Sequence, residues 1–322
     1  MTVLVTGGAG YIGAHTSRAL TAAGHDVVVL DSLELGRRAM VGTLPLVVGD
    51  IANQGLVAAL VREHGVDSCI HFAAYKAAGE SMVQPGRYFA NNVAGTNTLI
   101  EALQREGVEA IVFSSSCAVY GTPELLPVSE ATPVHPESPY GESKLLVERV
   151  LGWYDTCLGV RSMRLRYFNA AGAAADGTIG EDWTVALNLV PLAMKALLGA
   201  RPPLEVFGTD YPTPDGTAVR DYVHVDDLAD AHVRALEHLL RGGPSATLNL
   251  GTGTGSSVRQ VLAAAGRAAG RPVPAADVAR RPGDPTAIWA DATMAAGLLD
   301  WRATRTLDEI VASAWAWHSR HR

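Results

Sequence analysis

Short apolar runs alternate with longer stretches of helical spacing through the first half of the chain. The apolar runs cover residues 3–5, 26–30, 44–48, 68–74, 110–113 and 161–166. The stretches between them include 15–23, 53–64 and 88–106, where apolar residues recur with the spacing of one helix face. Strands that alternate with helices in this way predict a doubly wound parallel sheet of the α/β class.

After residue 170 the alternation becomes irregular, which predicts a smaller second lobe. The elements expected there are a helix within 182–199, a strand at 204–207, a polar loop at 208–218, a helix at 225–241, a strand at 248–251 and a last helix at 307–318. The strand at 248–251 is expected to return to the large sheet. We therefore predict a first domain over residues 1–170, which shares elements from roughly 220–252, and a C-terminal lobe over 171–322.

The composition is that of a globular protein and excludes several classes of partner. Of the 322 residues, 48% are hydrophobic and 18% are charged, so the chain can bury a sizeable core. A net charge of −7 without a long basic run argues against nucleic-acid and anionic-membrane surfaces. The apolar runs are also far shorter than the roughly 20 residues needed to span a bilayer.

Cysteine and histidine usage indicates the compartment and argues against a metal site. The chain enters a strand at once, which leaves no room for a signal peptide. Cys69, Cys117 and Cys157 are few, odd in number and far apart, so a reducing, cytoplasmic location is expected. The ten histidines show no ligand spacing, and His318 and His321 are expected in a solvated tail, so no metal is predicted.

A glycine-rich turn lies between the first expected strand and the first expected helix. Gly7, Gly10 and Gly13 are spaced G-x-x-G-x-x-G, unlike the G-x-G-x-x-G of ordinary dinucleotide-binding dehydrogenases. Such a turn lets backbone N–H groups and the positive end of a helix dipole face a diphosphate. Its place between strand and helix favours a Rossmann-like dinucleotide site over a plain tight turn.

The second expected strand ends in Asp31, 18 residues after Gly13. A carboxylate there can bind the ribose hydroxyls of an adenosine and would repel a 2′-phosphate, so NAD is favoured over NADP. The alternative is an ordinary surface acid at a strand end. Ligands of such sheets lie beyond the carboxyl ends of the strands. The other candidate residues at those ends are Asp50, Ile51, Phe72, Ala73, Ala74 and Ser116.

A tyrosine and a lysine share one face of a further expected helix. Ser138 and Pro139 have the properties of its N-cap and first residue, and Tyr140 and Lys144 then lie one turn apart. A free tyrosine with a pKa near 10 is a poor base at neutral pH, but a nearby ammonium and a nicotinamide cation would lower that pKa. This spacing alone is common by chance. Here it follows a half-domain of the dinucleotide-binding type and a serine-rich strand end, and in that context it predicts the catalytic pair.

These motifs extend through the rest of the chain, and the most specific of them covers residues 207–225. The others lie at 5–13, 114–116, 140–144, 166–169, 289–291 and 301–302. With this set the chain resembles the UDP-glucose 4-epimerases of the extended short-chain dehydrogenase/reductase superfamily over nearly its whole length. The resemblance implies NAD-dependent interconversion of UDP-glucose and UDP-galactose, with a Rossmann domain for NAD followed by a UDP-sugar-binding lobe.

The resemblance also implies a role for each matching residue. Tyr140 would be the base, Ser116 its hydroxyl partner, and Lys144 would bind the nicotinamide ribose. The expected substrate-binding residues are Ser116, Asn169, Asn188, Leu189, Phe207, Arg220, Tyr222, Arg281, Asp284 and Ile288. The expected cofactor-binding residues are Gly7, Gly10, Tyr11, Ile12, Gly13, Asp31, Ser32, Asp50, Ile51, Phe72, Ala73, Ala74, Lys76, Asn91, Ser114, Tyr140, Lys144 and Tyr167. From the residues alone, surface salt bridges are the alternative for Arg220 and Arg281. A homodimer is expected.

Three departures from the relatives bear on substrate range. Cys117 and Ala118 stand where relatives often have Ala-Thr, and the loop after Asp31 is shorter than in many of them. Ile288 stands where glucose/galactose-restricted bacterial relatives have Tyr. The first two leave the reaction type intact. The third predicts additional use of UDP-GlcNAc and UDP-GalNAc, unless Ile288 serves only to pack the pocket wall.

Three other functions are weighed against the leading one. Epimerisation of another UDP-sugar, such as a UDP-pentose or UDP-uronate, would need the same residues. A sugar-nucleotide 4,6-dehydratase would place an Asp-Glu pair directly after Ser116, where this chain has Cys117 and Ala118. A non-catalytic NAD-sensing protein on the same fold would not need both Tyr140 and Lys144. Because fold alone cannot separate these functions, the catalytic residues decide between them.

Overall fold

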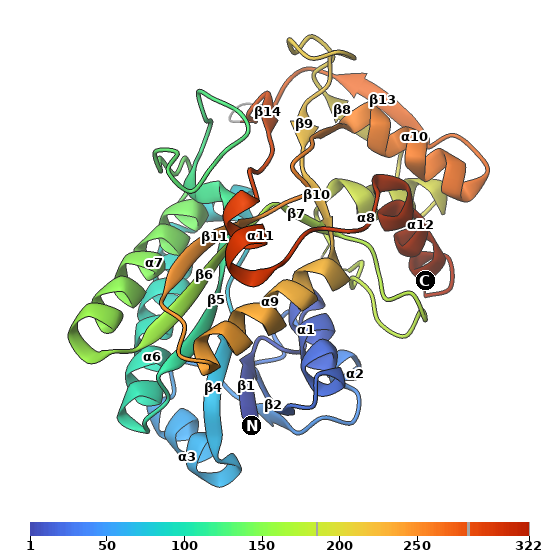
Figure 1. Cartoon of the computed structure of the whole chain (residues 1–322). Helices are drawn as coiled ribbons and strands as arrows, with labels where there is room; N and C mark the ends of the chain where they lie inside the picture. Colours follow the sequence, from blue (N-terminus) through green and yellow to red (C-terminus); the bar gives the residue numbers. More distant parts are fainter. Residues whose placement is uncertain (185, 282–283, 322) are drawn as a thin grey trace.

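The computed structural model describes residues 1–184, 186–281 and 284–321 of the chain. Its centre is a sheet of seven parallel strands, which confirms the predicted α/β class (Figure 1). In spatial order the strands are β11 (Ala246–Leu250), β6 (Arg161–Tyr167), β5 (Ala110–Ser116), β4 (Val66–His71), β1 (Thr2–Thr6), β2 (Asp26–Asp31) and β3 (Leu46–Val48). The order reverses at β1, which lies between β2 and β4, so a crevice opens at the carboxyl ends of these strands.

Helices cover both faces of this sheet (Figure 1). One face carries α3 (Gln54–His64), α6 (Thr96–Arg105) and α7 (Pro139–Leu158); the other carries α1 (Tyr11–Ala22) and α9 (Val225–Leu240). Successive residues of β1 enter the two cores, Val3 and Val5 on the α1 side and Leu4 on the α3 side, and all three are fully buried. A strand buried on both faces explains why the apolar runs in the sequence are continuous.

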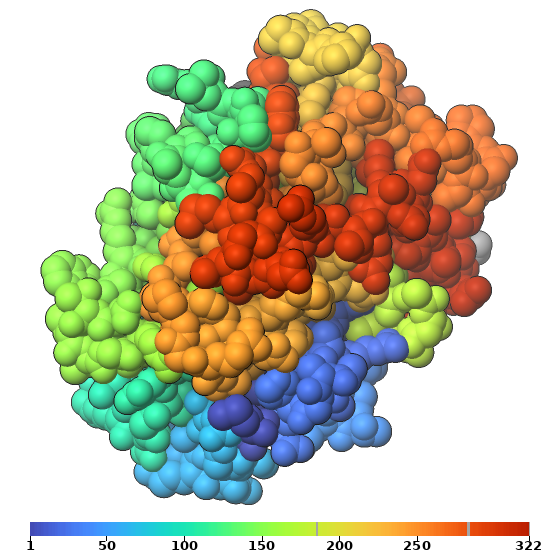
Figure 2. Space-filling model, viewed as in Figure 1, coloured from blue at the N-terminus to red at the C-terminus, as the bar shows by residue number. Residues whose placement is uncertain are grey.

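The second lobe has a separate apolar core. It comprises α8 (Leu189–Leu197), α10 (Val258–Ala269), α12 (Leu307–His318) and the strand pair β8 (Leu204–Phe207) and β13 (Ala275–Val278). Between it and the large sheet lie β7 (Asn169–Ala171) and β10 (Tyr222–His224) (Figure 1). The other elements of this part of the chain are β9 (Val219–Arg220), β12 (Ser256–Ser257), β14 (Ala287–Ile288) and α11 (Thr293–Leu299). The red C-terminal part of the chain lies across the middle of the face in Figure 2, and so joins the two lobes.

The chain crosses between the lobes more than once. β11 pairs with β6 at the edge of the large sheet, as predicted for residues 248–251, and α9 packs on that sheet. The remaining short elements are α2 (Arg38–Val41), α4 (Ala78–Val83), α5 (Pro85–Tyr88), η1 (Phe89–Gly95) and η2 (Cys117–Val119).

Two predicted elements differ from the structure where they approach the crevice. The strand expected to reach residue 74 ends at His71, so Phe72, Ala73 and Ala74 leave the ladder as a loop at its carboxyl end. The single helix expected over 88–106 is divided, because Phe89–Gly95 forms a π-helical turn between α5 and α6. π turns carry no simple sequence pattern and occur often at functional sites.

The expectation for His318 is wrong. Its side chain is only 2% exposed, and its ring stacks on Trp183 with the ring centroids 5.8 Å apart. Tertiary packing of α12 against the second lobe therefore overrides the polar character of the C-terminal residues. In the part of the chain that the structure describes, no helix is long and apolar enough to cross a membrane.

Candidate active site

A cavity of about 460 Å³ opens at the carboxyl edge of the large sheet. It collects residues from β1, β2, β4, β5, α7 and the loops that follow them, so segments far apart in sequence share one space. All of the residues that we predicted to bind the cofactor contribute to its lining, from Gly7 in the glycine turn to Tyr167 at the end of β6. The structure thus brings this predicted set together around one volume.

The glycine turn is packed so closely that side chains would not fit. Gly7 has a φ of +72°, and a Cβ on it would lie 2.6 Å from the backbone nitrogen of Ala73. A Cβ on Gly13 would lie 2.4 Å from the carbonyl oxygen of Gly7. The missing side chains let the start of α1 approach the end of β1. Tyr11, Ile12 and Gly13 of the first turn of α1, whose N–H groups have no partner within the helix, line the cavity as a cradle. This geometry fits the diphosphate of a dinucleotide.

Asp31 links the end of β2 to the glycine turn. One carboxylate oxygen accepts a hydrogen bond from the Ala9 N–H at 2.9 Å, and the other accepts from the Leu33 N–H at 2.8 Å. The side chain is 7% exposed and still lines the cavity. A carboxylate has about four acceptor positions, so oxygens that bind two amides can also accept from ribose hydroxyls.

Tyr140 and Lys144 extend from α7 into the same cavity. The helix begins where predicted, because the Ser138 hydroxyl accepts from the Gly141 N–H at 3.2 Å and Pro139 is its first residue. The Lys144 ammonium donates to the carbonyl oxygen of Ser114 at 2.7 Å. Burial raises the pKa of Tyr140 to about 12, against the opposing effect of a hydrogen bond with Ser116. Burial also lowers the pKa of Lys144 to about 7.

The π-helical turn positions two asparagines beside this pair. Asn91 lines the cavity. Asn92 is buried, and its amide nitrogen donates to the carbonyl oxygen of Tyr75 at 3.0 Å and to the Ser143 hydroxyl at 3.1 Å. Ser143 in turn donates to the Tyr140 carbonyl oxygen at 2.7 Å. Through Asn92 and Ser143, the π-helical turn η1 is therefore hydrogen-bonded to the first turn of α7.

Several cavity residues were missed at the sequence level. They are Ala9, Leu30, Glu34, Leu35, Gly36, Arg37, Met40, Gly49, Tyr75, Ala77, Glu80, Glu181, Asp182 and Leu187. The last three come from the loop before α8, which ion pairs connect to the first domain. Asp182 lies 2.7 Å from the Arg37 guanidinium, and Glu181 lies 3.6 Å from the Lys76 ammonium. No local pattern indicates these contacts, because the two residues of each ion pair lie far apart in the sequence.

Four of the predicted substrate residues lie on the short strands β7, β9, β10 and β14. Asn169 and Tyr222 are paired neighbours on β7 and β10, and Arg220 pairs with Ile288 across β9 and β14. Arg220 is therefore on a strand. Burial raises the pKa of Cys117, the residue after Ser116, to about 12, and the charge of Arg220 opposes this shift. Asn188 is the N-cap of α8, and Leu189 is its first residue.

Arg281 and Phe207, two further predicted substrate residues, are in contact with each other. The guanidinium carbon of Arg281 lies 5.1 Å from the centroid of the Phe207 ring, within the range of a cation–π contact. The same guanidinium makes two hydrogen bonds of 3.0 Å to Asp284. The salt bridge weighed as an alternative for Arg281 is thus present, whereas Arg220 donates to the carbonyl oxygen of Val219 at 2.8 Å.

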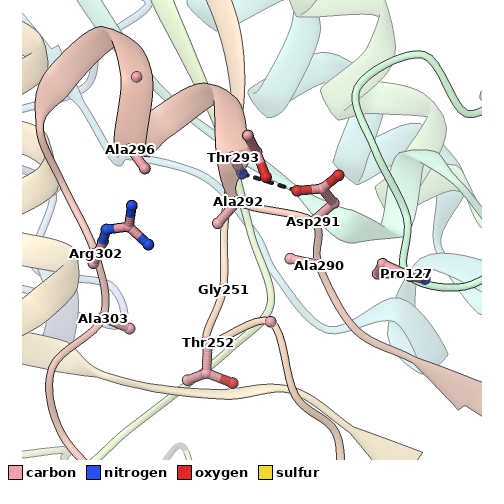
Figure 3. A pocket seen from close by; sticks show the side chains of 12 residues that line it. Pro127, Gly251, Thr252, Ala290, Asp291, Ala292, Thr293, Ala296, Arg302 and Ala303 are labelled. Atoms are coloured by element: carbon pink, nitrogen blue, oxygen red, sulfur yellow. Dashed lines mark hydrogen bonds between the residues drawn. The ribbon is translucent and has the colours of Figure 1, made fainter.

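A second hollow, of about 540 Å³, lies at the carboxyl end of β11 beside α11 (Figure 3). Small residues such as Gly251 and Ala292 form most of its wall, and its charged lining residues are Asp291 and Arg302. Asp291 already accepts from the Thr293 N–H at 2.9 Å. The glycine cradle and the tyrosine–lysine pair face the first cavity, so we place the candidate active site there.

Comparison with known proteins agrees with this geometry. The NAD dependent epimerase/dehydratase family matches residues 3–251, so the chain belongs to that family. Within it, the chain is similar to the UDP-glucose 4-epimerase of Azospirillum brasilense, with 50% identity over 98% of this chain and 91% of the relative. It is 46% identical to the UDP-glucose 4-epimerase of Streptococcus mutans over 100% of this chain and 98% of the relative.

A solved structure extends the likeness to the backbone. The UDP-glucose 4-epimerase of Stenotrophomonas maltophila, with bound NAD and formylated UDP-arabinopyranose, matches with a TM-score of 0.96 and 43% identity. The match covers 99% of this chain and 98% of that chain. The predicted Rossmann-like architecture of the large sheet is therefore confirmed.

Proposed function

We propose that the chain is an NAD-dependent isomerase that interconverts UDP-glucose and UDP-galactose at C4 of the sugar. The observation that carries the proposal is the convergence of Tyr140, Lys144 and the glycine cradle on one cavity, in a chain that belongs to an NAD dependent epimerase/dehydratase family. Ser116 lies beside Tyr140 at the end of β5. The short strands with Asn169, Arg220 and their neighbours would hold the UDP-sugar.

The cradle and Asp31 fit NAD, which when bound supplies the acceptor and donor of the C4 hydride. Tyr140 would take the proton from the C4 hydroxyl during oxidation and return it to O4 after the 4-keto sugar has turned over. The Ser116 hydroxyl would bind the same oxygen. Lys144 would bind the nicotinamide ribose, and its ammonium form would favour the Tyr140 phenolate. Two cations from separate segments, Arg220 and Arg281, would neutralise the diphosphate of the substrate.

The proposal is tested by incubating the purified protein with UDP-galactose and identifying the product by NMR. We expect UDP-glucose at an equilibrium ratio without added NAD, because the cofactor is regenerated in each turnover. Parallel reactions with UDP-arabinopyranose and a UDP-uronate test the other 4-epimerase activities. A 4-keto-6-deoxy product would indicate a dehydratase, and bound NAD without turnover of any sugar would indicate a non-catalytic protein.

We also propose that UDP-GlcNAc and UDP-GalNAc are turned over, and the argument rests on Ile288. Its side chain is 5% exposed and packs with Val119, Leu145 and Phe168, next to the helix that carries Lys144. Ile is shorter than Tyr by most of a ring and leaves more room beside C2 of a sugar. Methylene-sized differences in an apolar pocket discriminate by about 1–3 kcal/mol each, so relaxed specificity is expected rather than a switch.

Replacing Ile288 by Tyr is expected to abolish the use of UDP-GlcNAc and to leave the use of UDP-glucose within a few-fold of the parent. Steady-state kcat/KM values for both substrates check this result, and Ile288→Val serves as a control that adds no volume. A wild type that rejects UDP-GlcNAc, or a Tyr variant that still accepts it, would show that Ile288 only packs the wall.

Finally, we propose a cytoplasmic homodimer. The three cysteines are free, which suits a reducing compartment. Helix α7 exposes Trp153 (68%) and Leu158 (51%) near its C-terminal end, and a second copy of the chain would cover them. Trp153→Glu is expected to shift the sedimentation coefficient from dimer to monomer. A wild type that sediments as a monomer would contradict the proposal.

A further inference from the structure

Helix α7 presents three residues to the large sheet at four-residue intervals, which places them on one helix face. Tyr140 and Lys144 face the cavity. Glu148 lies one turn further on and is 5% exposed, so a carboxyl side chain is buried next to the candidate active site. A buried carboxylate is strongly unfavourable unless it is paired and hydrogen-bonded.

Glu148 is paired with Arg166 of β6. The Arg166 Nε donates to Glu148 Oε1 at 2.8 Å, and its Nη2 donates to Oε2 at 2.5 Å, which is a bidentate arrangement. Arg166 is itself 7% exposed and also donates to the Tyr120 hydroxyl at 3.0 Å. Both ends of this ion pair are therefore fixed within the core.

Three consecutive serines of β5 contact α7, and the ion pair contacts the middle one of them. The Ser115 hydroxyl donates to Glu148 Oε1 at 2.5 Å. The Ser114 carbonyl oxygen accepts from Lys144, and the Ser116 hydroxyl interacts with the Tyr140 phenol. Each serine thus meets a residue on a different turn of α7. A shift of the helix along the strand would break all three contacts together.

The charge of Glu148 also acts on Lys144. The titratable and charged groups around Lys144 are Tyr140 and Glu148 on its own helix, His71 on β4, Arg166 and Tyr167 on β6, and, beyond Tyr140, Tyr88 on α5 and Glu80 on α4. Burial keeps His71 neutral, with a pKa of about 3. Glu148 raises the pKa of Lys144, in opposition to burial.

We propose that Glu148 is a positioning residue, which aligns Tyr140 and Lys144 of α7 with Ser116 of β5. It acts through Arg166 and Ser115 without touching substrate or cofactor. The inference rests on the proposed epimerase function for its kinetic consequence, but not for its effect on Lys144, which is measurable without turnover.

The test compares Glu148→Gln with the wild type and with Glu63→Gln, the same change at an exposed position on α3. In Glu148→Gln we expect kcat for UDP-galactose at pH 7 to fall about tenfold or more, equivalent to one pKa unit, with little change in KM. The loss should shrink as the pH rises, because the variant then reaches the phenolate form of Tyr140. Glu63→Gln should behave as the wild type.

A second measurement follows Lys144 directly. The pH dependence of its reaction with acetic anhydride, read by mass spectrometry, gives the midpoint of its titration in the folded protein. We expect this midpoint to move to lower pH in Glu148→Gln, since the remaining Arg166 charge also disfavours the ammonium. If the wild type does not convert UDP-galactose, the proposed function fails, whereas this measurement still decides the role of Glu148.

The single variant could lose activity by failing to fold, since it leaves Arg166 as an unpaired buried charge. The double variant Glu148→Gln with Arg166→Met removes that charge and serves as the control for folding. It should retain a cooperative thermal transition and still show the kinetic loss at neutral pH. An equal loss of kcat at every pH, with the Lys144 midpoint unchanged, would reduce Glu148 to a purely structural residue and overturn the proposal. So would a variant with unchanged kcat.

Discussion

Replacing Tyr140 by Phe is expected to lower turnover of UDP-galactose by at least about 10²-fold, as is typical of losing a general base, while UDP-sugar binding stays near normal. Phe keeps the ring, whose edge-to-face contact with Tyr88 has a centroid distance of 6.5 Å, and removes only the hydroxyl. The hydroxyl is the group that interacts with Ser116 at the end of β5. Turnover assays together with isothermal titration of UDP separate the two effects.

Tyr154→Phe is the matched control for this experiment. Tyr154 lies on the same helix, and its hydroxyl donates to Asn97 at 3.4 Å on the exposed side. The control should turn over UDP-galactose as the parent does. Turnover of Tyr140→Phe within a few-fold of the parent would show that another group moves the C4 hydroxyl proton.

The pKa shifts in the cavity oppose the charged forms of both members of the proposed catalytic pair. With a pKa raised to about 12 by burial, Tyr140 is almost fully protonated at pH 7 in the free cavity. Burial lowers the pKa of Lys144 to about 7, which weakens the preference for its ammonium form near neutral pH. Lys144 lies one turn from Tyr140 on α7, and the charge of Glu148 raises the pKa of Lys144 against the larger effect of burial.

The cofactor cavity was predictable from the sequence because its residues occupy regular local positions. Gly7, Asp31, Phe72 and Ser114 lie at or just after the ends of parallel strands, and the topology brings such ends to one edge. Helix periodicity places Tyr140 and Lys144 on one helix face, and their position after the dinucleotide-type half and the serine-rich strand end distinguishes them from a chance spacing. Each inference needed the spacing within one segment and the rule that parallel strands share a carboxyl edge.

The parts that the sequence did not reveal depend on contacts between distant segments. Arg37 and Asp182 meet across the cavity although nothing near either residue indicates the other. The strands that carry Arg220 and Ile288 are two residues long, too short for an alternating pattern. His318 is buried because α12 packs onto the second lobe, which its own polar neighbours do not indicate. In each case tertiary packing, not local preference, determines the structure.

Replacing Asp31 by Ala is expected to weaken NAD retention roughly 100-fold. This change corresponds to about 3 kcal/mol of binding free energy, which is in the range of one or two hydrogen bonds to a charged group. The carboxylate contributes in two ways. It faces the cavity at the end of β2, and it binds the Ala9 and Leu33 N–H groups that shape the glycine turn and the following loop. NAD released by denaturing the protein after gel filtration, measured per protein chain, gives the retained fraction.

Asp31→Asn and Asp26→Ala separate these contributions. Asn keeps the size and one acceptor oxygen, so it should preserve more of the turn while losing the charge that would repel a 2′-phosphate; NADP should then compete better than in the parent. Asp26 lies at the exposed opposite end of the same strand, and its replacement should leave retention unchanged. If Asp31→Ala retained NAD as the parent does, or if the parent itself yielded NADP, the carboxylate would not be the group that selects the cofactor.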